Sequence, residues 1–140
     1  MTDIGMVLGR LGTKLVTEVA PKLEGDYSGG HAAMAGLMSV MAGEAWDGAA
    51  DRLFTEIGEI RSLLQQGGMA FDVPESPSLK VSDLTKERDF LALNLIALQA
   101  SVETREDEAA KMLNAQIWVH LMKTAQARMP SPPVFPDAEG

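Results

Sequence analysis

The chain has 140 residues, about the length of one ordinary domain, and 46% of them are hydrophobic, which is typical of a globular protein. It contains no Cys, which excludes disulfides, thiolate metal sites and cysteine nucleophiles. The net charge of −8 argues against binding to nucleic acid or to an anionic membrane, because both of these partners are themselves negatively charged.

The start of the chain shows no secretory leader, because Asp3, Arg10 and Lys14 interrupt the apolar residues there. The longest uncharged apolar run covers residues 32–43, far short of the ~20 residues that a membrane span requires. The lack of Cys also favours a reducing compartment. We therefore expect a cytoplasmic protein.

The first predicted helix covers residues 3–23, and Pro21 should end or kink it. Its apolar residues recur at steps of three and four and share one face: Ile4, Leu8, Leu11, Leu15 and Val19. On a flanking face lie Gly5, Gly9 and Gly12, each of which costs up to ~1 kcal/mol of helix propensity relative to Ala. Two interpretations stay open: a partner helix approaches closely over these glycines, or they are simply tolerated near a chain end.

The second predicted helix covers residues 29–66, with Ser28 as a candidate N-cap and Gly67 as its stop. Its apolar face drifts by about a quarter turn between its two halves, at ~100° per residue. The first half presents Met34, Leu37, Met38, Met41 and Ala45, and the second half presents Leu53, Ile57, Ile60 and Leu64. Either one long helix meets different neighbours, or the helix breaks within residues 43–48; we favour the unbroken helix.

A connecting loop over residues 67–81 leads to the third predicted helix, residues 82–103. Its main apolar stripe consists of Leu84, Leu91, Leu95, Leu98 and Val102. Phe90, Leu93 and Ile96 extend the apolar surface around the helix, which is typical of a helix that is buried on several sides. Because four helices offer limited cover, these three residues predict an oligomer interface.

The fourth predicted helix covers residues 105–128, and the short link before it indicates an antiparallel hairpin with the third. Its inner face carries Ala110, Leu113, Ile117, Leu121 and Ala125. Residues 129–140 are rich in Pro and are predicted to be a disordered tail. The predicted fold is all-α: one four-helix antiparallel bundle-like domain over residues 1–128, with a long second helix.

The sequence contains no motif for catalysis or for a di-metal site. A carboxylate-bridged di-metal site needs Glu-x-x-His pairs, but neither His31 nor His120 has a Glu three residues before it. Glu44, Asp47 and Asp51 follow one side of the second helix and could bind a cation, although such a row is more often a solvated face. We predict no metal, no cofactor and no catalytic residue.

Several isolated residues are candidates for ligand binding. Asn114 falls within the inner stripe of the fourth helix, where a buried amide without partners costs on the order of 1–3 kcal/mol. Gln99 could be its partner across the hairpin, and we favour a role in setting helix register over ligand contact. His120 flanks the same face and could act as a general base, although we favour a hydrogen-bonded histidine at the helix flank. Met38 and Met41 could line an adaptable apolar surface, although core packing is the commoner role.

The best hypothesis is a non-catalytic interaction or assembly module that forms a homodimer through an apolar helix face, with another protein as a further possible partner. The alternative is a small-molecule-binding protein or an enzyme whose pocket lies between the helices. That pocket would be lined by the ligand-binding candidates Asn114, Gln99, His120, Met38 and Met41. Neither nucleic acid nor a membrane is an expected partner.

Overall fold

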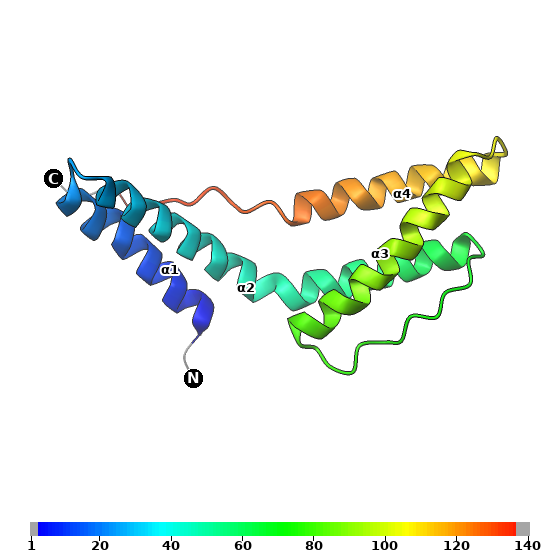
Figure 1. Cartoon of the computed structure of the whole chain (residues 1–140), viewed down its shortest axis with the longest axis horizontal. Helices are drawn as coiled ribbons and strands as arrows, with labels where there is room; N and C mark the ends of the chain where they lie inside the picture. Colours follow the sequence, from blue (N-terminus) through cyan, green and yellow to red (C-terminus); the bar gives the residue numbers. More distant parts are fainter. Residues whose placement is uncertain (1–2, 137–140) are drawn as a thin grey trace. The chain divides into compact units, whose positions relative to one another are not determined.

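The computed structural model describes residues 3–136, which form helices and loops but no strand. Helix α1 (Ile4–Lys14) continues into a π-helical turn (Leu15–Val19) and a 3₁₀ turn (Ala20–Leu23). The other helices are α2 (Tyr27–Gln66), α3 (Val81–Glu103) and α4 (Glu108–Ala127) (Figure 1). The predicted all-α fold is confirmed, and the second helix is long and unbroken.

The chain forms two compact units, which are described separately. Among the described residues, unit 1 comprises residues 3–48 and 130–136, and unit 2 comprises residues 49–129. The predicted single domain over residues 1–128 stays a prediction.

Two helix starts differ from the predictions because Asp26 and Asp107 accept hydrogen bonds from the backbone nearby. Helix α2 begins at Tyr27, so Ser28 is not its N-cap; the backbone N–H and hydroxyl of Ser28 instead donate to the Asp26 carboxylate at 3.4 and 3.2 Å. Helix α4 begins at Glu108 rather than at residue 105, because Asp107 caps it by accepting from the Ala110 N–H at 3.1 Å. As predicted, the first helical segment ends soon after Pro21.

A seam of paired glycines joins α1 to the first half of α2 in unit 1. A Cβ atom added to Gly12 would lie 2.4 Å from the Gly36 carbonyl oxygen, and one added to Gly43 would lie 2.7 Å from the Gly5 carbonyl oxygen. Gly5 and Gly12 are seven residues apart on α1, and their partners Gly43 and Gly36 are seven residues apart on α2. This matched spacing fits two antiparallel helices whose backbones touch. Of the two interpretations that the sequence left open, close approach of a partner helix therefore holds at Gly5 and Gly12, whereas Gly9 faces open space.

Unit 2 contains the hydrophobic core. The buried apolar residues are Ile57, Ile60, Leu63 and Leu64 of α2, Leu84, Leu91, Leu95, Leu98 and Val102 of α3, and Ala110, Leu113 and Ile117 of α4. The predicted stripe of α3 is thus confirmed in full. On α4, Leu121 and Ala125 are exposed, contrary to the prediction, because the buried face of that helix ends at His120.

The loop between α2 and α3 is fastened to unit 2 by a buried ion pair. Arg61 donates to Glu87 Oε1 from Nη2 at 2.7 Å and from Nε at 3.1 Å, and Nη2 also donates to the Val73 carbonyl at 2.9 Å. The other Glu87 oxygen accepts from the Ser76 N–H at 2.7 Å. Because Glu87 is only 7% exposed, these donors supply the hydrogen bonds that its buried carboxylate needs.

The segment after α4 returns to unit 1. Residues 130–136 have no helix or strand, and the Ser131 N–H and hydroxyl donate to the Glu44 carboxylate at 3.2 and 2.6 Å. The remainder of the predicted disordered tail, residues 137–140, lies outside the described residues.

Candidate functional site

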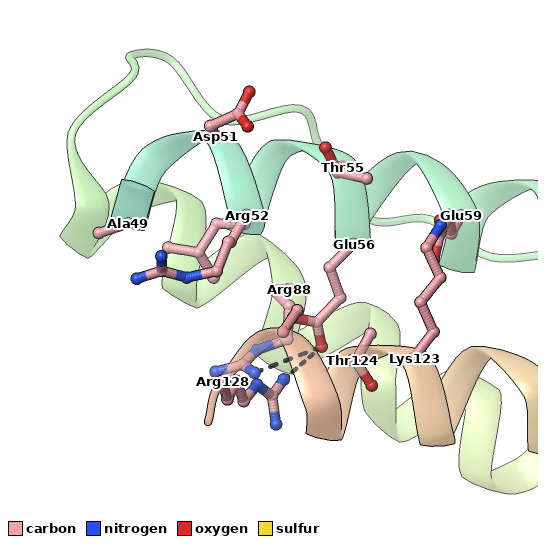
Figure 2. Close-up of a pocket in the computed structure, with 12 residues that line it drawn as sticks. Ala49, Asp51, Arg52, Thr55, Glu56, Glu59, Arg88, Lys123, Thr124 and Arg128 are labelled. Carbon is pink, nitrogen blue, oxygen red and sulfur yellow. Dashed lines mark hydrogen bonds and ion pairs between the residues drawn. The ribbon is translucent and has the colours of Figure 1, made fainter. Parts of the chain in front are cut away.

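Charged side chains from three helices line a groove of about 290 Å³ in unit 2 (Figure 2). Its cationic residues are Arg52, Arg88, Lys123 and Arg128, its acidic residues are Asp51, Glu56 and Glu59, and the rest of the wall is formed by Ala49, Leu53, Thr55, Thr124 and Ala127. In Figure 2, Asp51 and Thr55 lie on the side of α2 away from α4, whereas Arg52 and Glu56 extend towards α4. A third of the twelve Lys and Arg residues of the chain therefore surround one small groove.

Glu56 lies at the centre of the first ion-pair cluster. Its Oε1 atom accepts from Arg128 Nη2 at 2.5 Å and from Arg88 Nη1 at 3.5 Å, which links α2 to α4 and to α3. The Arg88 Nε atom is buried and lies 2.8 Å from Asp89 Oδ1, but the two do not have hydrogen-bonding geometry. Two guanidinium groups thus share one carboxylate oxygen and retain N–H groups for which no acceptor is seen within the described residues.

Glu59, one turn further along α2, forms the second cluster. It accepts a hydrogen bond from Lys123, and its Oε2 atom lies 2.8 Å from His120 Nδ1. The hydrogen bond from Lys123 and the contact with His120 together lower the pKa of the Glu59 carboxyl group, against an opposing effect of partial burial. Since a charged Glu59 is favoured, it can orient the His120 ring while Lys123 balances its charge.

His120 is buried and lines a shallow hollow of about 260 Å³ together with Glu59 and Ser62. The Ser62 hydroxyl accepts from the Gln66 side chain at 3.2 Å, and no bond between Ser62 and His120 occurs in the described part of the chain. The arrangement therefore holds α4 to α2 and positions an imidazole, but it does not assemble an activated serine.

The predicted ligand-binding residues fall in both units. Asn114, Gln99 and His120 belong to unit 2, whereas Met38 and Met41 belong to unit 1. The predicted Asn114–Gln99 pair is wrong: the buried Asn114 Oδ1 has no partner among residues 3–136, and the Gln99 amide donates to Glu103 at 3.1 Å because that carboxylate is one turn away. Ligand roles for these residues stay predictions.

The predicted interface residues are exposed. Phe90, Leu93 and Ile96 are 59%, 65% and 64% exposed, respectively. At ~100° per residue, Leu93 and Ile96 lie on the side of α3 opposite its buried stripe.

Sequence analysis missed a second outward apolar row, Met112, Val119 and Met122 of α4, although its spacing of seven and three residues is visible in the sequence. It also missed Glu87. The signal there was a carboxylate inside the apolar stripe between Leu84 and Leu91, where a charge has to find a buried partner.

Neither a metal site nor a membrane-spanning helix emerges from the described residues. No cluster of three or more His, Asp or Glu side chains within residues 3–136 could hold a metal ion. The acidic row is solvent-exposed, with Glu44 and Asp47 in unit 1 and Asp51 in unit 2. No helix in the same range combines the length and the apolar character needed to cross a membrane.

Comparison with known proteins yields no match: no protein-family model fits the sequence, and no curated protein or solved structure is significantly similar to it.

Proposed function

We propose that this protein is a non-catalytic assembly module that self-associates through the outward face of α3. The observation that carries the proposal is the exposure of Phe90, Leu93 and Ile96 on one helix. Single exposed apolar residues are common on protein surfaces, but a contiguous group of large ones is typical of a protein-binding surface. Aromatic side chains such as Phe90 are also enriched at interfaces.

The surroundings of this face suit contact with an identical copy. Exposed Lys86 and Asp89 supply both signs of charge at its edge, so a second copy need not bring only like charges together. A twofold interface uses the same patch on both subunits, and an apolar patch is complementary to itself.

The predicted cytoplasmic location remains a prediction.

The test is the solution mass of a variant with charges placed on the face. We expect Leu93→Glu with Ile96→Glu to keep the helical circular dichroism of the parent but to lower its mass in light scattering. Two buried carboxylates without partners would oppose association. The control is Gln65→Glu with Gln126→Glu, which adds two carboxylates at exposed positions of α2 and α4.

The control should keep the parent mass. A parent that is already monomeric at micromolar concentration contradicts the proposed function, as does an α3 variant that keeps the parent mass.

The groove in unit 2 supports a second candidate function, the binding of a small oxyanion such as a carboxylate or a phosphate. The supporting observation is that Arg88 and Arg128 share one oxygen of Glu56 while Lys123 and Arg52 line the same groove. Guanidinium groups are suited to such anions because their N–H groups form a planar fork.

Thermal melts in phosphate and in succinate, at ionic strength matched with chloride, test this candidate and separate the two anion types. We expect Arg128→Gln to abolish a melting shift that Lys111→Gln, at an exposed α4 position outside the groove, retains. Glu56→Gln should enlarge the shift, because it removes the competing negative charge. The absence of any shift in the parent excludes both anions.

A further inference from the structure

Unit 1 buries no large side chain. Among residues 3–48 and 130–136, the buried residues are all glycines, at positions 12, 29, 36 and 43. The apolar residues of α1 remain partly or substantially exposed, including Ile4, Val7 and Leu11, which recur along one face beside the glycine seam. The two helices therefore touch through their backbones, and although side chains such as Val16 and Val40 lie at the seam, none of the large apolar side chains becomes buried.

A unit of this size needs a further source of stability. Unit 1 has 53 described residues, and domains below about 70–80 residues often depend on a disulfide, a metal ion or association with another chain. The chain has no Cys, and no metal-binding cluster occurs within residues 3–136. Association with another chain is a source of stability that small domains use, and the exposed apolar face of α1 is the surface that it would cover.

We propose that α1 packs antiparallel against α1 of a second copy of this chain, so that two hairpins form a four-helix bundle. This inference rests on the proposed self-association and identifies a surface for it outside α3. If the twofold axis passes through the middle of the apolar stripe of α1, Ile4 of one copy lies close to Leu15 of the other. No charged residue belongs to the stripe, whose members are Ile4, Val7, Leu8, Leu11 and Leu15.

The charge of residues 3–19 suits an identical partner better than a strongly charged one. Residues 3–19 carry Asp3 and Glu18 against Arg10 and Lys14, so this segment is neutral although the whole chain has a net charge of −8. In the antiparallel arrangement, Asp3 of one copy lies opposite residue 16 of the other, between Lys14 and Glu18, which pair with each other at 4.0 Å, so no like-charge contact is forced. Two copies can therefore meet here without the repulsion that their overall charge would produce elsewhere.

The face of the whole hairpin comes close to the area that a dimer needs. Residues 4–23 are about 30 Å long at 1.5 Å per residue, and two neighbouring helices are about 20 Å wide, which gives one hairpin face roughly 600 Å² before side-chain relief is included. A stable interface buries about 800 Å² per partner. The hairpin face approaches this requirement, whereas α1 alone would not.

The decisive comparison is Leu11→Glu against Met6→Glu. Both change one half-exposed apolar residue of α1 to Glu, since Leu11 is 49% and Met6 46% exposed, but Met6 lies on the side of the helix opposite the stripe. We expect Leu11→Glu to lower the mass measured by light scattering, and Met6→Glu to keep the parent mass. Equal masses for the two variants overturn the inference.

A second measurement covers the case in which Leu11→Glu fails to fold. Because the chain lacks Cys, Leu11→Cys accepts a single nitroxide label, and α1 pairing places the two labels about one interaxial distance, roughly 10 Å, apart. Strong dipolar broadening in the electron paramagnetic resonance spectrum supports the pairing. A fully labelled oligomer with no broadening overturns it.

The outcomes also separate this inference from the proposed function. If Leu93→Glu with Ile96→Glu lowers the mass while Leu11→Glu does not, self-association through α3 stands and α1 pairing fails. The reverse result supports α1 pairing and removes α3 as the interface. A parent that is monomeric overturns both.

Discussion

Replacing Gly12 by Ala should destabilise unit 1, whereas the same change at Gly9 should stabilise it. The added Cβ at position 12 would lie 2.4 Å from the Gly36 carbonyl oxygen and 2.6 Å from Val40 Cγ2. A backbone carbonyl cannot rotate away as a side-chain end can, so the two helices must separate. At position 9, no described atom beyond the adjacent backbone of the same helix lies within 4 Å of the added Cβ.

The expected magnitudes follow from two opposing terms. Overpacking costs about 1–3 kcal/mol, and Ala in place of Gly in a helix regains up to about 1 kcal/mol. Gly12→Ala should therefore lower the free energy of unfolding by about 1–2 kcal/mol. Gly9→Ala receives only the favourable term and should raise it by about 0.5–1 kcal/mol. The two variants should move in opposite directions from the parent.

Tryptophan fluorescence can isolate unit 1 in this experiment. The chain has two Trp residues, with Trp46 in unit 1 and Trp118 in unit 2, so a Trp118→Phe background leaves the first as the reporter. Urea unfolding is then followed at one fixed protein concentration, because any oligomer makes stability depend on concentration. If Gly12→Ala is as stable as Gly9→Ala, the backbone contact across the glycine seam does not exist in solution.

Three further predictions concern unit 2. Glu87→Ala should lower the free energy of unfolding by about 2–4 kcal/mol and increase hydrogen exchange over residues 67–80, because Arg61 loses its buried partner. Glu108→Ala, at an exposed position, should change the free energy of unfolding by less than about 1 kcal/mol. A loss below about 1 kcal/mol for Glu87→Ala would contradict the role of the ion pair. The pKa of Glu59 is lower in the folded protein than its usual value near 4.5, so its stabilising contribution is present above that pH and is lost as the pH falls through the folded pKa. Urea unfolding between pH 7 and 3 should show the advantage of the parent over Glu59→Gln shrinking on acidification, and a constant gap would refute it. Asn114→Leu should raise the melting temperature, since it removes a buried oxygen without a partner; a decrease would instead favour the register-setting role predicted from the sequence.

Periodicity alone was sufficient to predict the helices. Apolar residues at steps of three and four predicted the buried stripe of α3 in full, and Gly67 marked the end of α2, where Gly68 adopts the left-handed φ of +64°. These features depend on residues that are neighbours along one helix, so the sequence contains the information directly. Helix starts were less certain, because Asp26 and Asp107 compete with other residues nearby as caps.

The partners of individual residues were decided by tertiary structure. The sequence put Gly5, Gly9 and Gly12 on one face, but only the packing of α2 distinguishes the two that touch it from the one that does not. Likewise, Arg61 and Glu87 are 26 positions apart, and Gln99 turns to Glu103 rather than to Asn114. A repeating pattern fixes the direction of a side chain about its own helix axis, whereas its contacts depend on the position of a second helix, which no local pattern specifies.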